Sequence, residues 1–457
     1  MLFKIIIDHI RILIFTLSLF SGLLSLDNEY WMKDYGGNGM DELYNLEITK
    51  TGDYLFVGST ESKGNGVKSR YNYKGQIIDC PTPRDHFWID GSTDIWLLKL
   101  DKFGNKIWET TYGSDLNEEA YSVIELSCGN YLILGAKHNL DSNYDIFVVK
   151  VDSYGNEIWN RTYGGILDDK AYHINELIDG NYAIIGSTKS YGNGESDMWF
   201  IKIDQDGEEL YNRTFGSSLD DFGYFFIEKS NGDFLITGSH TILKDRTYKD
   251  KVFTDKKMYS WILSTNSKGE ILWENKSNRG IGQFIKKTKS GNYLIRETLS
   301  SQGMPNKHLN LRLIDKAGET IWESFLEDVN GIFGGNTIEE SPDDGFYIIS
   351  YTYGYIDLTD FGDIKLIKTD TKGKKLWEKI YNGQSLGIDR GNSIKLTKDN
   401  KLIICGYTNV NGEKVLIKLD NNDKEYKSSH QGRLNEIITP LTKNSWIIKT
   451  DLNGDIN

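Results

Sequence analysis

The sequence predicts an all-β fold, a single β-propeller of four-stranded blades, on three observations. The chain of 457 residues repeats itself with a period of about 50 residues. Each repeat holds four short runs rich in β-branched and aromatic residues, and turn residues separate these runs. No apolar pattern with a helical period follows residue 26. A period of this length with four strands per unit is typical of propellers.

The second and third repeats show the unit most clearly, because they match nearly end to end. They read TYGSDLNEEAYSVIELSCGNYLILGAKHNLDSNYDIFVVKVDSYGNEIWNR and TYGGILDDKAYHINELIDGNYAIIGSTKSYGNGESDMWFIKIDQDGEELYNR. The four expected strands of the second repeat are AYSVIEL, NYLILGA, DIFVVKV and EIWNR. An Asp-x-x-Gly turn motif recurs eight times, once with Asn for the Asp and once with Asp for the Gly. We therefore expect eight blades, the last one thin, with seven blades and an irregular closure as the alternative.

This turn motif is expected to join the third and fourth strands of each repeat. Its Asp can accept a hydrogen bond from the backbone two residues on, and its Gly can adopt the left-handed conformation that the turn requires. An aromatic residue usually follows seven positions after the Asp, and we expect it to pack between neighbouring blades. The structural repeat residues that we single out are Trp31, Asp101, Gly104, Trp108, Asp152, Gly155, Trp159, Gly207, Trp273, Trp322, Trp377 and Asp451.

The two ends of the chain are expected to share one blade. The turn that begins at Asp451 calls for an aromatic residue at the next position after Asn457, where the sequence ends. Near the start, EYWMKDYGG aligns with KIWETTYGS and EIWNRTYGG of later repeats, which places Trp31 at the missing aromatic position. We therefore expect the N-terminal strand to close the last blade, so that the ring has no open seam.

The first 26 residues differ in kind from the repeats. Lys4 and Arg11 precede an uncharged stretch from Ile12 to Leu26, which is short for a membrane span and suits a signal peptide. We divide the chain into a signal peptide or N-terminal anchor, residues 1–26, and a propeller domain, residues 27–457. The expected location is secreted or at the cell surface. A membrane association is expected only if the segment stays uncleaved.

Charge and composition exclude several classes of partner and chemistry. The net charge of −13 argues against nucleic acid and anionic membranes, which both select basic surfaces. Three scattered cysteines, Cys80, Cys128 and Cys405, are too few for a disulfide framework or a metal cluster. None of the seven histidines shares a motif with Ser, Cys or another His, so no catalytic triad and no zinc spacing is predicted. We expect a monomer that is not an enzyme.

The repeats resemble a family of exported bacterial and archaeal proteins, the PQQ-like or tryptophan-docking β-propeller repeat family. The likeness rests on the recurring Asp-x-x-Gly-x-x-x-Trp core, the Tyr-Gly-Gly that follows it and the Asp-Gly-Asn-Tyr type turn, and it runs from about Asn28 to Asn457. Members are often labelled only PQQ-like or bulb-type-lectin-like. The resemblance implies a propeller fold and brings no activity with it.

The chain departs from both better-known relatives of these repeats. Quinone enzymes of the propeller class need a calcium site beside the cofactor, and many have a vicinal Cys-Cys pair, which is missing here. Their tryptophan-docking turns also carry one more residue. The sugar-binding motif of bulb-type lectins, Gln-x-Asp-x-Asn-x-Val-x-Tyr, does not recur convincingly. We therefore expect no cofactor and regard a quinone-dependent enzyme as the least favoured interpretation.

Acidic residues recur at the expected strand ends. Pairs precede the first strand, and single residues lie seven positions before the turn Asp: Asp41-Glu42, Glu118-Glu119, Asp168-Asp169, Asp220-Asp221, Asp94, Asp145, Asp197 and Asp363. Because an active site is needed once and these acids recur in many repeats, we interpret them as caps that bind loop backbone. A ring of calcium ions is the alternative, since carboxylate oxygens suit that cation.

Two insertions predict the binding face. The first repeat adds SKGNGVKSRYNYKGQIIDCPTPRDHFWIDG and the fourth adds LKDRTYKDKVFTDKK, both between the second and third strands. In propellers these connections share a face with the loops that join blades. The first insertion carries an aromatic and basic cluster of a kind enriched at interaction surfaces: Arg70, Tyr71, Tyr73, Arg84, His86, Phe87 and Trp88. We expect a scaffold that binds a protein or peptide there, with a carbohydrate-binding propeller as the alternative.

Overall fold

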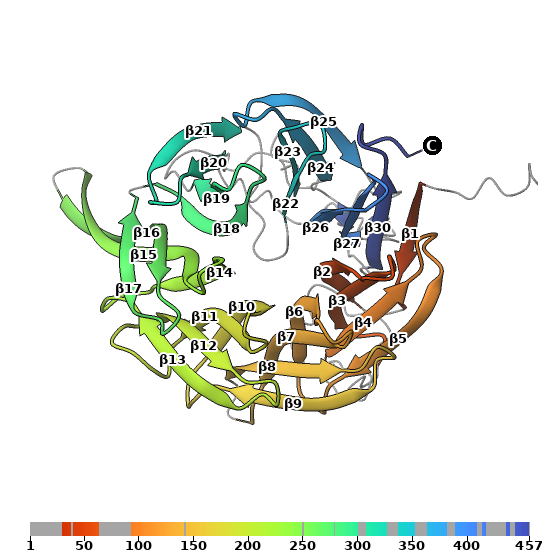
Figure 1. Ribbon diagram of the computed structural model, residues 1–457, viewed down its shortest axis with the longest axis horizontal. Helices are drawn as coiled ribbons and strands as arrows, with labels where there is room; N and C mark the ends of the chain where they lie inside the picture. Colours follow the sequence, from red (N-terminus) through yellow and green to blue (C-terminus); the bar gives the residue numbers. More distant parts are fainter. Residues whose placement is uncertain are drawn as a thin grey trace, which may run out of the picture.

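The computed structural model is a ring of antiparallel four-stranded sheets arranged around a central axis (Figure 1). The structure describes residues 30–37, 40–63, 93–140, 143–248, 251–277, 279–299, 308–326, 337–351, 363–381, 389–408, 414–416, 436–438 and 444–456. Within these ranges there are seven blades and no helix. The proposed signal segment, residues 1–26, lies outside the described part of the chain.

The first four blades follow one another along the chain. Blade 1 consists of β2 (Asp41–Ile48), β3 (Tyr54–Thr60), β4 (Asp94–Leu100) and β5 (Lys106–Tyr112). Blade 2 consists of β6 (Glu118–Glu125), β7 (Tyr131–His138), β8 (Tyr144–Val151) and β9 (Glu157–Tyr163). Blade 3 consists of β10 (Asp169–Glu176), β11 (Tyr182–Thr188), β12 (Asp197–Ile203) and β13 (Glu209–Phe215). Blade 4 consists of β14 (Phe222–Glu228), β15 (Phe234–Tyr248), β16 (Lys251–Thr265) and β17 (Ile271–Lys276).

The remaining three blades complete the ring. Blade 5 consists of β18 (Ile281–Lys287), β19 (Tyr293–Leu299), β20 (His308–Ile314) and β21 (Thr320–Leu326). Blade 6 consists of β22 (Ile338–Glu340), β23 (Phe346–Tyr351), β24 (Ile364–Thr369) and β25 (Lys375–Tyr381). Blade 7 consists of β26 (Arg390–Leu396), β27 (Leu402–Thr408), β30 (Asn444–Thr450) and β1 (Trp31–Tyr35).

The expectation of eight blades with a thin last one is wrong, and the alternative of seven is confirmed. Two segments compete for the third strand of blade 7, and β30 takes that place, with Cys405 opposite Ile447 in the ladder. The run before the turn at Asp420 forms β28 (Lys414–Leu416), which pairs with β29 (Glu436–Ile438) in a sheet of two strands. That segment is therefore an insertion into a complete blade. Its turn residue, Asp420, lies outside the described residues.

Closure of the ring by the N-terminal strand is confirmed. β1 pairs with β30 antiparallel, from Trp31 opposite Lys449 to Tyr35 opposite Ser445, and Figure 1 shows the two strands side by side at the seam. Trp31 is 4% exposed. Its ring lies against Tyr54 of blade 1, with 6.4 Å between the ring centroids. The first and last strands of the chain thus hold blade 7 against blade 1.

The turns have the predicted chemistry. Asp101 accepts hydrogen bonds at 2.8 Å from the N–H groups of Phe103 and Asn105 through one carboxylate oxygen, and Gly104 has φ of +76°. A Cβ added at Gly104 would lie 2.9 Å from the ring of Trp31. Glycine is therefore required for the backbone conformation and for the close approach of the docked ring.

The turn glycine and the aromatic residue that docks on it belong to neighbouring blades. A Cβ added at Gly207 would lie 3.1 Å from Trp159, and Gly318 and Gly373 meet Trp273 and Trp322 in the same way. The last turn differs, because Gly454 meets Tyr381 and Lys379 where the pattern predicts Trp377. Each outer strand thus packs on the next blade.

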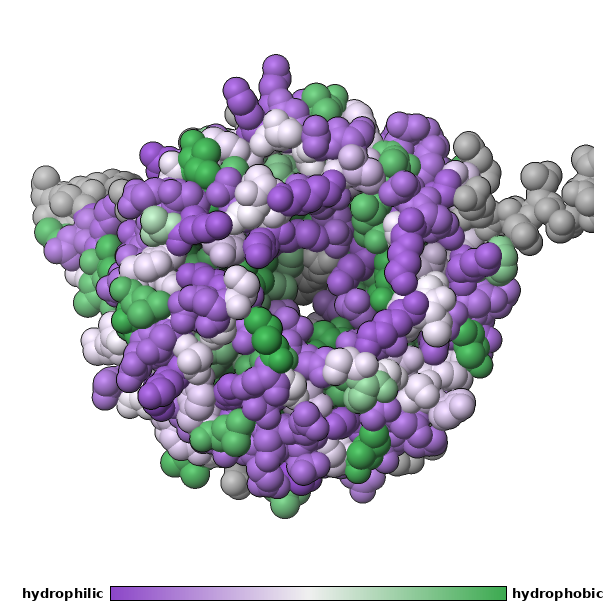
Figure 2. Space-filling model, viewed as in Figure 1, coloured by the Kyte–Doolittle hydropathy of each residue, from purple (hydrophilic) through white to green (hydrophobic). Residues whose placement is uncertain are grey.

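A bulge in the innermost strand shapes the centre of the ring. In blade 1 the register shifts between Leu43 and Asn45, so Tyr44 is the extra residue. Five other blades have the same shift in the innermost strand. Opposite the bulge the backbones approach closely: a Cβ at Gly58 would lie 1.7 Å from the carbonyl oxygen of Glu42. A bulge re-aims the side chain that it carries. Figure 2 shows the ring hollowed at its centre.

Candidate functional site

The connections between second and third strands share a face with the loops that join blades, as predicted. Ser196, which follows β11, forms a bridge with Asp220 in the loop between blades 3 and 4. Lys189 donates its N–H to the carbonyl of Asp168 in a blade-joining loop, and its ammonium pairs with the carboxylate of that residue at 2.8 Å. We call this side the insertion face. The opposite side, which carries the Asp-x-x-Gly turns, is the turn face.

The acidic residues at the starts of the first strands cap the blade-joining loops. Asp41 accepts the N–H of Gly37 at 2.6 Å, and Asp169 accepts that of Gly165 at 2.8 Å. Glu118 and Asp221 do the same to Ser114 and Ser217. All four carboxylates belong to residues that are at most 1% exposed. The hydrogen bonds that the capping interpretation requires are therefore present.

Removing divalent cations is expected to leave the stability unchanged. The capping carboxylates already accept backbone N–H groups, and in the described residues no three acidic, His or Cys side chains are placed to hold a metal ion. We expect EDTA to shift the melting temperature by no more than the error of a thermal melt. A large drop that added calcium reverses would contradict the capping interpretation and support the ring of calcium ions.

An extended hairpin stands out from the insertion face of the described part of the chain. β14 pairs with β15 only as far as Ser239, and β17 pairs with β16 only from Trp261. β15 and β16 continue together to Tyr248 opposite Lys251, and Figure 1 shows them projecting away from the ring. We call residues 242–258 the arm. The arm is formed by the insertion of the fourth repeat, which was predicted to lie on this face.

Apolar side chains are exposed on both strands of the arm. Ile242, Leu243, Val252, Phe253 and Met258 are between 41% and 66% exposed. Large exposed apolar groups that gather on one element mark interaction sites more often than scattered single ones do. The arm therefore presents a contact surface.

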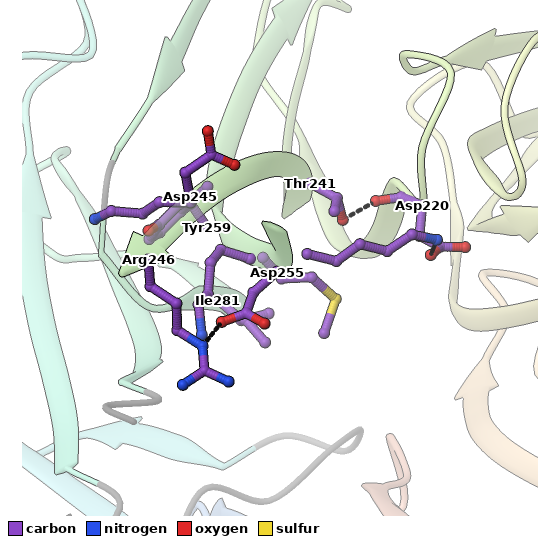
Figure 3. A pocket seen from close by; sticks show the side chains of 11 residues that line it. Asp220, Thr241, Asp245, Arg246, Asp255, Tyr259 and Ile281 are labelled. Carbon is purple, nitrogen blue, oxygen red and sulfur yellow. Dashed lines mark hydrogen bonds and ion pairs between the residues drawn. The ribbon is translucent and has the colours of Figure 1, made fainter. Parts of the chain in front are cut away.

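A hollow of 610 Å³ lies at the base of the arm (Figure 3). Arg246 pairs with Asp255 across it, at 2.7 Å between Nε and Oδ2. The hydroxyl of Thr241 donates to the carbonyl of Asp220, and the ammonium of Lys256 pairs with the carboxylate of Asp220 at 3.2 Å. The two contacts to Asp220 fasten the base of the arm to the loop between blades 3 and 4.

Tyrosines line part of the central channel. The bulge residue of the innermost strand is tyrosine in blades 1 to 4: Tyr44, Tyr121, Tyr172 and Tyr224. The hydroxyls of the first two donate to Glu42 and Glu119, each at 2.6 Å. Burial, and then the charge of Glu42, raises the pKa of Tyr44 well above its usual range. These hydroxyls therefore stay protonated and act as donors near neutral pH.

Charged groups also lie on the innermost strands of several blades. Lys395 of blade 7 pairs with Glu47 of blade 1 at 2.9 Å, and Lys286 of blade 5 pairs with Glu339 of blade 6 at 2.6 Å. Burial, and then the charge of Lys395, lowers the pKa of His173 to about 3. The His173 ring is therefore neutral at physiological pH. It stacks on the ring of Phe225 in blade 4.

Blade 5 carries buried charge at positions that hold glycine and apolar residues in blade 1. Glu297 occupies the strand position of Gly58 in blade 1, and Asn310 occupies that of Trp96. Glu297 pairs with Arg312 at 2.6 Å and accepts a hydrogen bond from Asn310 at 2.8 Å. All three residues of this cluster are at most 4% exposed. These residues could not be recognised from the repeat pattern, because they depart from what the repeats share.

The aromatic and basic cluster of the first insertion lies outside the described residues. Its members are Arg70, Tyr71, Tyr73, Arg84, His86, Phe87 and Trp88. The insertion itself leaves the ring between β3 and β4 on the insertion face. The cluster stays a prediction, and its point of attachment is on the same face as the arm.

Comparisons with known proteins give distant likenesses. No protein-family model matches this chain. It is 25% identical over 181 residues to the regulatory protein FlaEY of Caulobacter vibrioides. The aligned segment covers 34% of this chain and 18% of that protein. The chain thus spans less than a fifth of the length of this curated relative.

Among solved structures the chain is similar to other propellers. For the Dos1 propeller the TM-score is 0.44 at 12% identity, covering 83% of this chain and 93% of that one. For an ulvan lyase of polysaccharide lyase family PL25 the TM-score is 0.49 at 10% identity, covering 82% and 93%. At these scores neither likeness assigns a substrate or a reaction to this chain. A search of the described residues finds no helix with the length and apolarity needed to cross a membrane.

Proposed function

We propose that this protein is an exported, non-catalytic scaffold that binds a protein or peptide at its insertion face. The observation that carries the proposal is the arm, a β-hairpin with exposed apolar side chains that stands out from a closed ring. Hairpins and edges of this kind bind partners through their backbone and side chains together. The proposed export rests on residues 1–26. We further propose that the protein acts as a monomer outside the cell or at its surface.

The ring suits the role of a rigid support. Docked aromatic residues and turn glycines join successive blades on the turn face, and capped loops join them on the insertion face. Sites built on rigid elements hold their binding groups in place before the partner arrives, which lowers the entropy cost of binding. The arm is therefore presented from a fixed base.

A carbohydrate ligand is the second candidate, and the tyrosines of the channel favour it. Four rings from consecutive blades lie along one wall, with 6.0 Å between the centroids of Tyr44 and Tyr121 and 5.2 Å between those of Tyr172 and Tyr224. Aromatic rings with a polar tip suit sites that are apolar at one end and wet at the other. A glycan array probed with the Tyr121→Ala variant beside the parent separates this candidate from the first.

Site-directed photo-cross-linking tests the proposed function. A photoreactive phenylalanine replaces Val252 on the arm, 66% exposed, and in a matched variant it replaces Ile178 on the turn face, 70% exposed. We expect discrete adducts with extracellular protein at position 252 and none at position 178. Equal adducts at both positions would contradict the proposal.

An arm-shortened variant serves as the second control. Residues 244–255 are replaced by Asn-Gly, which closes the hairpin with a two-residue turn because Leu243 lies opposite Lys256. We expect this variant to melt like the parent and to lose the partner that cross-links at position 252. Retention of that partner would place the binding site elsewhere.

Deleting residues 66–90 tests the cluster of the first insertion. This segment lies outside the repeat, so we expect the cooperative melt to stay within experimental error. We expect capture of the partner to fall, because the deletion removes the aromatic and basic side chains from the insertion face. Unchanged capture would exclude the cluster from the site.

A further inference from the structure

We propose that the arm binds an acidic, extended segment of its partner by β-strand addition. This inference rests on the proposed function and names the chemistry of the partner. Beyond Thr241, β15 has no neighbour except β16, and before Tyr259, β16 has no neighbour except β15, among the described residues. Such edges offer unpaired N–H and C=O groups to an added strand.

The length of the arm suits this mode of binding. Residues 242–248 and 251–258 form its two strands, and each spans about 25 Å at roughly 3.3 Å per residue. A segment of about seven residues could pair along either edge. Main-chain hydrogen bonds of this kind supply affinity, while the side chains that alternate along the edge supply specificity.

The charge of the arm selects an acidic partner. Residues 242–258 contain six basic and three acidic residues, on a protein whose net charge is −13. Arg246 and Lys256 already have carboxylate partners. Lys244 and Lys257 have no ion pair with any described residue, so their charges remain available. A basic element attracts acidic segments, while the net negative charge of the whole protein opposes association with other copies of this chain.

The basic and apolar side chains of the arm lie in a pattern that a strand can match. Ile242 is opposite Lys257, Lys244 is opposite Asp255, and Arg246 is opposite Phe253, so these six share one face of the hairpin. The other face carries Leu243, Val252 and Met258. An added strand with a carboxylate at every second residue would place its acids beside Lys244 if it pairs with β15, or beside Lys257 if it pairs with β16. The apolar residues between its carboxylates would then lie on the other face, beside Leu243 of β15 or beside Val252 and Met258 of β16.

A lipid surface fits the arm less well. Within a bilayer the open edges would leave backbone N–H and C=O groups without hydrogen-bond partners. The acidic ring would also be repelled by anionic lipids. The same open edges that oppose insertion favour pairing with another strand, which decides between the two kinds of partner.

Fluorescence anisotropy with a defined peptide tests the inference. The probe is a fluorescein-labelled ten-residue peptide that alternates Glu and Val. One control peptide alternates Lys and Val, and another repeats the acidic sequence with N-methyl groups on alternate residues, which remove edge hydrogen bonds and keep the charge. We expect the full-length protein to bind the acidic probe and neither control.

Variants of the protein complete the test. We expect the arm-shortened variant to lose the probe, and Lys244→Glu with Lys257→Glu to weaken it by about tenfold or more, as losing opposite-charge cross-strand pairs would do. Thermal melts confirm that both variants fold. Equal binding of the probe to the arm-shortened variant, or of the N-methylated peptide to the parent, would overturn strand addition.

Two further outcomes separate this inference from the proposed function. If the arm sediments with phosphatidylserine vesicles and does not bind the acidic probe, the partner is a membrane and the inference is wrong. If the probe fails while position 252 still cross-links a partner, recognition through the arm stands and the acidic-strand chemistry is rejected. If both fail, both proposals are rejected.

Discussion

Trp31→Ala is expected to lower the free energy of unfolding by ~3–5 kcal/mol, the usual cost of truncating a large buried aromatic residue. Trp31 is 4% exposed, lies over the Gly104 turn and donates its indole N–H to the carbonyl of Lys102 at 3.3 Å. It also packs on Tyr54. The substitution therefore removes the largest apolar side chain that the N-terminal strand packs against blade 1. Chemical denaturation of the variant against the parent measures the loss.

Met32→Ala is the matched control for that experiment. Met32 is the next residue on the same strand and is 44% exposed. Its truncation is expected to stay within about 0.5 kcal/mol, as surface substitutions usually do. If Trp31→Ala also cost less than about 0.5 kcal/mol, the N-terminal strand would not close the ring in solution.

Glu297→Ala is expected to destabilise the protein by ~3–5 kcal/mol, because it leaves Arg312 buried without its carboxylate. The pair is 2.6 Å long, with side chains that are 5% and 2% exposed. Asn310 loses its acceptor as well. Arg296, next to Glu297, lies in the same buried environment, and burial lowers its pKa to about 10. Blade 5 therefore depends on a network that has to be complete.

Two comparisons test whether burial is the cause. Glu208→Ala removes a carboxylate that is 70% exposed and pairs at 3.2 Å with Arg161, which is 39% exposed, and it should cost less than ~1 kcal/mol. Glu297→Gly combined with Asn310→Trp and Arg312→Leu restores the residues of blade 1 and should recover most of the loss. If Glu297→Ala cost no more than Glu208→Ala, the buried network would not stabilise blade 5.

The parts of the fold that every blade shares could be predicted from the sequence. The Asp and Gly of each turn constrain the backbone in the same way each time, so their repetition identified the turns and the strands beside them. Trp31 was recognised as the closing residue because it stands in the same local sequence as Trp108 and Trp159. Local patterns sufficed because the contacts concerned are made once per repeat.

The number of blades could not be read from the same motif. Asp420 begins a turn-like sequence, and β28 lies just before it, yet the ladder of β27 is filled by β30. A strand-like sequence pattern indicates that a segment can join a sheet. It does not indicate which neighbouring strand the segment pairs with. The competition between two suitable segments is decided by packing in three dimensions.

The contacts between blades on the turn face, and the points where strands stop pairing, were the hardest features to predict. Glu176 accepts the N–H of Ser127 at 2.6 Å, and Glu228 accepts that of Ile178 at 2.7 Å, so these acids join blades on the turn face. They resemble ordinary surface residues in the sequence. The open edges of the arm also depend on where β14 and β17 stop pairing, which sequence pattern does not show.

Recognition of a partner by the arm of the insertion face is tested most directly by amide hydrogen exchange. Exchange is measured with and without the partner that cross-linking at position 252 identifies. The amides at the open edges of residues 242–258 should exchange fast in the free protein. We expect the partner to slow amide exchange in residues 242–258 and to leave the exchange rates of the turn-face segment 176–182 unchanged. Slower exchange confined to the turn face, with the arm unaffected, would contradict it.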